Sequence, residues 1–145
     1  MNPEFEPPAG FQRHQRSSPM TAPWEPLFAR DQDGVISLGL QVREPHCNGR
    51  GFAHGGLMAS LADNAMGYSA VAQAKRQLDP PPRSALTVGL ALDYLDVAHI
   101  GDWLEIRPQV LKLGRSLAFC DCRLVALRAE REILVARASA SFRLV

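Results

Sequence analysis

The chain has 145 residues, with 16 basic and 15 acidic side chains, so its formal net charge is +1. This length suits one domain with its own hydrophobic core, and a 46% share of hydrophobic residues excludes general disorder. A nearly neutral chain also lacks the broad basic surface that attracts nucleic acids or anionic membranes. We therefore expect no nucleic-acid partner and no membrane partner.

The cysteines also indicate where the protein works. Cys47, Cys120 and Cys122 form an odd set without the spacing of a disulfide framework, which favours a reduced, intracellular environment. No segment reaches the roughly 18 apolar residues of a membrane-spanning helix. The first residues lack the basic start and apolar run of a secretory signal. We expect a cytoplasmic protein.

Residues 1–33 form the first compositional block, because they hold six of the eleven prolines and sustain no hydrophobic period. We expect a Pro-rich N-terminal arm that extends over the domain and is anchored by Phe11, Trp24 and Phe28. A flexible tail is the alternative. Residues 34–145 are expected to form a single domain without internal repeats.

The domain begins with alternating polar and apolar residues at 35–42, which predict a half-buried strand. From Gly55 to about Lys75, apolar and small residues instead recur at helical spacing with few charges between them. This pattern predicts a helix that is buried nearly all round. The prolines at 80–82 then enforce a loop.

Four segments of strand length follow, at about 85–95, 103–113, 117–127 and 133–144. The short connections between the last three predict an antiparallel meander, and Pro108 predicts a bulge or an edge. One face of the last strand is apolar, and its three alanines predict a bulky neighbour such as the helix. This face comprises Leu134, Ala136, Ala138, Ala140, Phe142 and Leu144. The expected fold class is α+β, with an antiparallel sheet wrapped around one long central helix.

The densest functional signal runs from Asn48 to Gly56, immediately before the predicted helix. Gly55 and Gly56 at a helix start leave backbone N–H groups without intrahelical partners, where the helix dipole favours negative charge. Such donors suit a developing oxyanion. A glycine-rich turn that only leads the chain into the core also explains a lone Gly-Gly pair. His54 is expected to cap the helix or to orient a carbonyl.

Asp63 lies inside the predicted helix among small and apolar residues. A buried ionised carboxylate needs partners, so Asp63 is a candidate general base or nucleophile. The alternative is that Asp63 and Asn64 mark a solvent-facing stripe. No metal site is expected, because His46, Cys47 and His54 lack a recognised ligand spacing. Cys120 and Cys122, on one face of a strand, are expected to pack in the core.

The string Asn48-x-x-Gly51-x-x-His54-Gly55-Gly56, followed seven residues later by Asp63, resembles the signature of the PaaI-like (phenylacetic acid degradation) acyl-CoA thioesterases. Gly101-Asp102 and residues 111–119 also resemble that family, and the resemblance extends from about residue 35 to the C-terminus. It implies a hotdog fold and the hydrolysis of acyl-CoA to free CoA and a carboxylic acid. It implies no cofactor and no metal.

The resemblance also implies roles for individual residues. Asp63 is expected to be the catalytic carboxylate, as nucleophile or general base, and the Gly55 N–H to polarise the thioester carbonyl. Asn48 and His54 would arrange that end of the site, while Thr87 would help to hold the water or the carboxylate.

Substrate contacts are expected from two places. Gly56 lies beside the carbonyl donor, and a turn near the CoA phosphates holds Lys112, Gly114 and Arg115. Asp96-Val97 stands where many relatives carry a basic residue and proline, so we exclude that segment from the CoA site.

The spacing of Gly55 and Asp63 implies more than one chain. Eight residues along a helix span about 12 Å, whereas the carboxylate and the oxyanion donor must both lie within about 3–3.5 Å of the reacting atoms. We therefore expect a homodimer with antiparallel helices across a two-fold axis, and a homotetramer of two such dimers. Two other functions stay open, a non-catalytic acyl-CoA or fatty-acid binding module and a hotdog enoyl-thioester hydratase or dehydratase.

Overall fold

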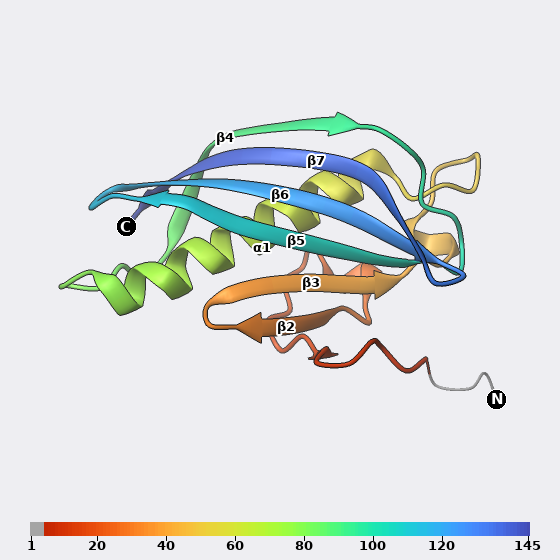
Figure 1. The fold of residues 1–145 in the computed structure, drawn as a ribbon, viewed down its shortest axis with the longest axis horizontal. Coiled ribbons are helices and arrows are strands. Elements are labelled where there is room, and N and C mark those ends of the chain that lie inside the picture. Colours follow the sequence, from red (N-terminus) through yellow and green to blue (C-terminus); the bar gives the residue numbers. More distant parts are fainter. Residues whose placement is uncertain (1–4) are drawn as a thin grey trace.

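The computed structural model describes residues 5–145, in which an antiparallel sheet curves around one long helix (Figure 1). The strand order is β1-β2-β3-β5-β6-β7-β4, and the last three strands of the chain form the expected meander. The expected α+β hotdog architecture is confirmed. In chain order the elements are β1 (Gln12–Arg13), η1 (Ala22–Trp24), β2 (Phe28–Gln32), β3 (Val35–Gln41), η2 (Glu44–His46), α1 (Gly55–Gln77), β4 (Ala85–Tyr94), β5 (Trp103–Leu113), β6 (Leu117–Arg128) and β7 (Arg131–Leu144).

The helix α1 packs on the concave face of the sheet through residues that recur at helical spacing. The buried members of this stripe are Leu57, Met58, Leu61, Ala62, Ala65, Met66, Ser69, Ala70 and Ala74. Other positions, such as Ser60, Asp63 and Asn64, are only half-buried. The expectation of a helix buried nearly all round is therefore wrong for the single chain, because the sheet covers only one side of α1.

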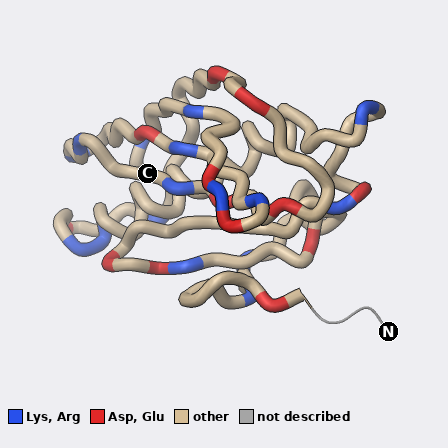
Figure 2. Tube along the Cα trace, turned by 45° about the vertical axis from the view of Figure 1, so that its right-hand side comes forward, with Lys and Arg blue, Asp and Glu red and all other residues tan. Residues whose placement is uncertain are grey.

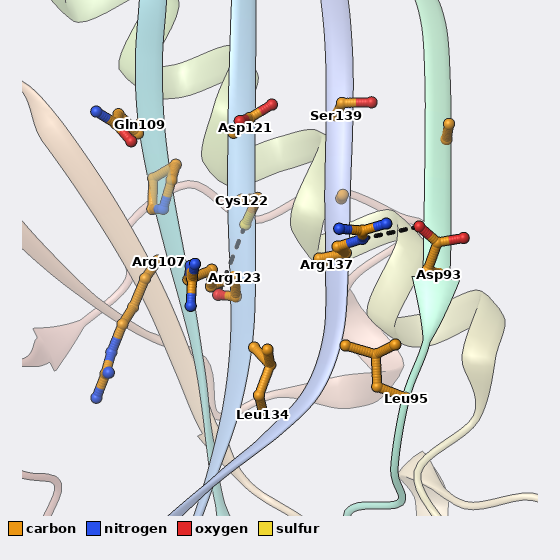
Figure 3. A pocket seen from close by; sticks show the side chains of 13 residues that line it. Asp93, Leu95, Arg107, Gln109, Asp121, Cys122, Arg123, Leu134, Arg137 and Ser139 are labelled. Carbon is orange, nitrogen blue, oxygen red and sulfur yellow. Dashed lines mark hydrogen bonds and ion pairs between the residues drawn. The ribbon is translucent and has the colours of Figure 1, made fainter.

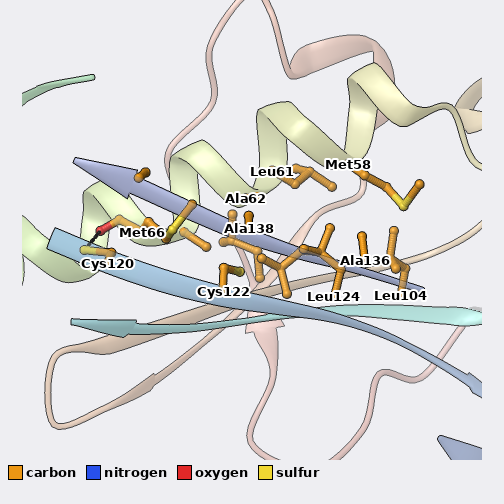
Figure 4. Packing of buried hydrophobic residues seen from close by; sticks show 14 of the residues in the cluster. Met58, Leu61, Ala62, Met66, Leu104, Cys120, Cys122, Leu124, Ala136 and Ala138 are labelled. Carbon is orange, nitrogen blue, oxygen red and sulfur yellow. Dashed lines mark hydrogen bonds between the residues drawn. The ribbon is translucent and has the colours of Figure 1, made fainter. Parts of the chain in front are cut away.

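Small residues on the sheet allow α1 to lie close to it (Figure 4). Ala136 and Ala138 on β7 lie beneath the helix in the same cluster as Leu61 and Met66. Cys120 and Cys122 belong to this core, each 2% exposed, which confirms their predicted packing role. Burial raises the pKa of each thiol to about 12, so both stay protonated at neutral pH.

The predicted inward face of β7 is wrong at one position. The register between β6 and β7 shifts after Leu124, and this irregularity turns Val135 into the core, where it is fully buried. Leu134 consequently lies on the outer face of the sheet, in a cavity that Leu95 and Arg137 also line (Figure 3). The edge predicted at Pro108 is confirmed, because the pairing of β5 with β3 ends at Ile106 and leaves that side of β5 unpaired at Pro108.

The N-terminal arm is anchored as expected. Phe11 and Phe28 are buried against Trp103, with ring centroids 5.1 and 5.8 Å from that of the indole. Trp24 packs on the main core. The strand β2 was not predicted, since it lies within the expected arm, and it pairs with β3 along its whole length. The division at residues 33 and 34 stays a prediction.

Charges of both signs are interspersed along the chain in the view of Figure 2. Two acids are nonetheless buried with cations. Asp102 receives hydrogen bonds from Arg128, and Glu105 receives them from Arg30 and Arg107. Among residues 5–145, no helix is long and apolar enough to cross a membrane.

Candidate functional site

A tight loop at residues 48–52 lies immediately before α1. The Asn48 side-chain oxygen accepts the backbone N–H groups of Arg50 at 2.9 Å and Phe52 at 3.3 Å, which closes the turn. Gly51 has φ +79°, a conformation that side-chain-bearing residues rarely adopt. Asn48 therefore shapes the loop before the helix, and its expected role in the site stays a prediction.

The helix begins at Gly55, with His54 as its N-cap. His54 Nδ1 accepts the backbone N–H of Gly56 at 2.8 Å, so the Gly56 donor is already engaged. Within the described part of the chain, the Gly55 N–H makes no hydrogen bond. A free N–H at the positive end of a 23-residue helix is suited to an anionic or polarised oxygen.

Tyr94, at the end of β4, is a contact that the sequence did not predict. Its hydroxyl donates to the Gly55 carbonyl oxygen at 2.7 Å, and burial raises its pKa, so the hydroxyl stays a neutral donor at neutral pH. A Cβ at position 55 would lie 3.2 Å from the tyrosine ring. This close approach explains why a glycine suits the first turn. The two residues are 39 positions apart, and no motif links them.

Asp63 and Thr87 are brought together directly. The Thr87 hydroxyl donates to Asp63 Oδ1 at 2.6 Å, because Thr87 pairs with the inward-facing Phe142 and so points toward the helix. None of the ion pairs within residues 5–145 involves Asp63. The carboxylate is thus held by one hydroxyl and keeps its second oxygen available.

The remaining expected substrate residues lie elsewhere in the single chain. Lys112 lies near the end of β5, and Gly114 and Arg115 lie in the turn between β5 and β6. In Figure 1 this turn lies near the C-terminal end of α1, at the opposite end of the molecule from Gly55. One chain therefore does not bring these residues to its own helix N-terminus.

Other titratable groups near the loop have structural roles. His46 is buried, its Nδ1 accepts the N–H of Arg43 at 2.9 Å, and its Nε2 contacts the Trp24 carbonyl at 2.9 Å. Burial lowers the pKa of His46, so the neutral ring with Nε2–H fits both bonds. Within residues 5–145, no group of three or more His, Cys, Asp or Glu residues is placed to hold a metal ion.

Comparison with known proteins now adds to this geometry. Residues 50–132, more than half of the chain, match the Thioesterase superfamily. The "Putative esterase PA0474" of Pseudomonas aeruginosa is 44% identical over 138 residues, which cover 94% of this chain and 96% of that protein. "Acyl-coenzyme A thioesterase 13" of Homo sapiens is 34% identical over 86 residues, which cover 59% of this chain and 57% of that protein.

Solved structures agree. Zebra fish thioesterase superfamily member 2 superimposes with a TM-score of 0.70 at 27% identity, over 82% of this chain and 81% of that one. The E. coli PaaI protein shares the fold, with a TM-score of 0.68 at 22% identity, over 82% of this chain and 79% of that one. The chain belongs to the thioesterase superfamily, and it is a thioester hydrolase whose hotdog fold is shared with the E. coli PaaI protein.

Proposed function

We propose that this thioester hydrolase is an acyl-CoA thioesterase that releases free CoA and a carboxylic acid. The observation that carries the proposal is the 2.6 Å contact between Thr87 and Asp63, which leaves one carboxylate oxygen free on a half-buried face of α1. The Gly55 N–H on the same helix supplies an unused donor. The relative named acyl-coenzyme A thioesterase supports the choice of substrate class.

In the proposed reaction, the thioester carbonyl oxygen accepts the Gly55 N–H, a type of interaction worth about 3–4 kcal/mol in acyl-transfer enzymes. Asp63 either takes a proton from a water whose oxygen attacks the carbonyl carbon, or attacks that carbon itself. The carbon–sulfur bond breaks, and the thiolate leaves and is protonated. In the second route, water then hydrolyses the acyl–aspartyl anhydride. Asn48 and His54 hold the helix start, and Gly56 lines it.

The primary test is thiol release from a panel of acyl-CoAs. Asp63→Ala should lower kcat by about 100-fold or more on the best substrate, because a positioned acid–base group contributes about 10²–10⁴-fold. Asp121→Ala is the matched control, since Asp121 is exposed on β6 and makes no hydrogen bond through its side chain within residues 5–145. Normal turnover by Asp63→Ala would refute the proposal. Tight acyl-CoA binding without thiol release by the wild type would indicate a binding module.

Turnover in H₂¹⁸O separates the two routes. Attack by Asp63 forms an anhydride, and its hydrolysis at the aspartyl carbonyl leaves ¹⁸O in the Asp63 peptide. General-base catalysis places the label only in the carboxylic acid product. Mass spectrometry of the proteolysed enzyme after several turnovers distinguishes these outcomes.

The proposed active unit is a homodimer that pairs along β4. This strand ends the sheet order, and its large apolar residues are exposed, with Val88 at 64% and Leu86 at 55%. An unpaired edge with exposed apolar side chains favours pairing with another chain. Antiparallel helices across such a two-fold axis would bring Asp63 to Gly55 of the partner subunit.

Mixing two inactive variants tests this shared site. Gly55→Pro removes the proposed donor at a position where proline suits a helix start, and the extended His54 (φ −66°, ψ 134°) tolerates a following proline. Gly55→Ala adds a Cβ but keeps the N–H, so it is the matched control. Random re-association of Gly55→Pro with Asp63→Ala makes about half of the dimers mixed, each with one intact site, and restores about one quarter of wild-type activity. No recovery would contradict a shared site.

The CoA phosphates are proposed to contact Lys112, Gly114 and Arg115. Lys112 and Arg115 are exposed cations, which can pair with phosphate oxygens. Arg115→Ala should raise KM for an acyl-CoA but not for the corresponding acyl-pantetheine, which lacks the phosphates. Arg131→Ala, at the start of β7, is the control, and an equal effect on both substrates would contradict the assignment.

Assembly and location complete the proposal. The exposed Leu111, Leu117 and Phe119 support association of two dimers into a homotetramer, so Phe119→Lys should shift the sedimentation coefficient toward that of a dimer. The three free cysteines support a cytoplasmic location. Cell fractionation would test it.

A further inference from the structure

A second cavity, of about 520 Å³, lies between the N-terminal arm and α1. Arg13, His14 and Arg16 of the arm line one side, and Tyr68 and Lys75 of the helix line the other. Apolar residues on β2, β3 and α1 complete the lining, namely Ala29, Ile36, Val71 and Ala72. Its volume falls within the usual range of about 300–1,000 Å³ for small-molecule sites.

This cavity is separate from the proposed thioester site. Tyr68 follows Asp63 by five residues, which places it about 140° around a helix of 3.6 residues per turn. Asp63 faces β4, where Thr87 holds it, whereas the cavity opens on the flank covered by β2 and β3. A hydrogen bond from the Ile36 N–H to the Ser69 hydroxyl, 2.9 Å long, fixes β3 against this flank.

The residues that line the cavity include more cations than anions. Arg13, Arg16 and Lys75 form no ion pair within residues 5–145. The single acid of the lining is Asp31, whose Oδ1 is engaged by the Gly34 N–H at 2.9 Å. Three cations against one carboxylate leave two positive charges, which match a phosphate monoester dianion better than a carboxylate. Arginine is also the side chain best suited to bidentate contact with phosphate.

Aromatic rings form another part of the lining, at Tyr68 and His14. The Arg16 guanidinium lies 5.2 Å from the centre of the Tyr68 ring, and the His14 ring centre lies 5.5 Å from it at 46°. Burial, then the charge of Arg16, lowers the pKa of His14, so its ring is neutral at neutral pH. Two planar groups beside an apolar lining suit a flat heterocycle, because such rings pack on aromatic and guanidinium planes.

We propose that this cavity binds a nucleotide, with its phosphate on the Arg13, Arg16 and Lys75 side chains and its base against Tyr68 and His14. The nucleotide is either a free mononucleotide or the nucleotide end of a CoA ester, because both present a phosphorylated aromatic base. The site is built largely by the arm, outside the residues that match the superfamily.

Calorimetric titration of the full-length protein with AMP and adenosine tests the proposal. AMP should bind at least about tenfold more tightly than adenosine, because only AMP offers a phosphate that can accept charge-assisted hydrogen bonds from the arginines and Lys75. Arg13→Gln combined with Arg16→Gln should weaken AMP binding by about tenfold or more, whereas Arg131→Gln should not. Equal affinity for adenosine and AMP, unchanged AMP binding by the double variant, or no binding at about 1 mM AMP would each overturn it.

Two further measurements show whether the bound nucleotide is a free mononucleotide or the nucleotide end of a CoA ester. Tighter binding of adenosine 3′,5′-bisphosphate than of AMP, with a raised KM for acyl-CoA in the double variant, supports the CoA end. AMP binding at least as tight, with an unchanged KM, supports a free nucleotide. Binding is measured in parallel on Asp63→Ala, so failure of the nucleotide site and failure of the proposed hydrolysis are distinguished.

Discussion

Two aspartates of this chain, Asp102 and Asp63, show how differently a fold uses the same carboxylate. Asp102 is 4% exposed, and its oxygens receive hydrogen bonds from Arg128 Nη2 at 2.7 Å and from the His99 N–H at 2.8 Å. Asp63 is half-buried and receives one hydrogen bond, from Thr87 at 2.6 Å. Within residues 5–145, Asp102 has a cationic partner and accepts hydrogen bonds on both carboxylate oxygens, whereas Asp63 has no cationic partner and accepts a hydrogen bond on one oxygen.

The difference separates a structural acid, Asp102, from the proposed catalytic acid, Asp63. Burial alone would raise the pKa of Asp102, but the hydrogen bonds from Arg128 and His99 outweigh it and hold the pKa below its ordinary value. Such a group is locked in its ionised form and ties the loop before β5 to the end of β6. Asp63 keeps an oxygen that can meet water or a carbonyl carbon. Changing each aspartate to the isosteric asparagine should therefore affect different properties.

The largest expected effect is on activity. Asp63→Asn should lower kcat for the best acyl-CoA by about 10²–10⁴-fold, because the amide can neither accept the proton nor attack. Its melting temperature should stay close to that of the wild type. Thiol-release kinetics and calorimetry on the same preparation check both statements, and a variant that unfolds early but turns over normally would reverse the comparison.

Asp102→Asn should show the opposite pattern. Replacing the carboxylate leaves Arg128 without its ion pair, which should lower the free energy of unfolding by about 2 kcal/mol. Chemical denaturation provides the measurement. At a temperature where both proteins are folded, kcat should stay within about twofold of the wild type, and a loss as large as that of Asp63→Asn would remove the distinction.

Thr87→Ala should give a smaller effect on activity alone. Losing one hydrogen bond worth about 1 kcal/mol should lower kcat by about fivefold, because Asp63 then loses the one hydrogen bond that its carboxylate accepts within residues 5–145. Thr87→Ser keeps the hydroxyl and should restore most of the rate. If serine and alanine behave alike, the hydroxyl does not position Asp63.

The smallest expected effect is on the pH dependence of the unfolding free energy. The folded pKa of Asp102 lies below the unfolded value, so its stabilisation is present above about pH 4 and is lost as the pH falls through the folded pKa. The difference in unfolding free energy between wild type and Asp102→Asn should therefore be constant at pH 5–7 and shrink toward pH 3. A difference that stays constant down to pH 3 would show that Asp102 gains nothing from its charge.

The sequence predicted α1 and five of the strands because their patterns are local. The glycines before α1, the small and apolar residues along it and the alternation in β7 each encode their own element. β2 was missed because five residues that include Arg30 and Asp31 carry no strand pattern, and the strand depends on its pairing with β3. Leu134 was misplaced because a change of register between two strands leaves no mark in either one.

The residues of the candidate site divide in the same way, into those with a local sequence signal and those that depend on contacts between distant segments. Asp63 and Gly55 could be singled out from the helix pattern and the motif, and Thr87 from the position of a Ser or Thr in similar enzymes. Thr87 donates a hydrogen bond to Asp63. Tyr94 could not be found, since its contact with Gly55 joins the end of one element to the start of another. Arg16 and Tyr68 likewise meet only because the arm folds back over α1.

The alanines of β7 connect the core to the strand and helix that carry the proposed site. Ala138 and Ala140 pair with Leu92 and Leu90 of β4, the strand that carries Thr87, while α1 rests on the same alanines. The size of their side chains sets the distance between α1 and the sheet, and therefore the position of Asp63 relative to Thr87. Natural variation from alanine to valine at these positions would lift the helix and lengthen a 2.6 Å hydrogen bond without altering any residue of the site. If Asp63 acts as proposed, methyl groups buried beneath the helix would change the catalytic rate from outside the site.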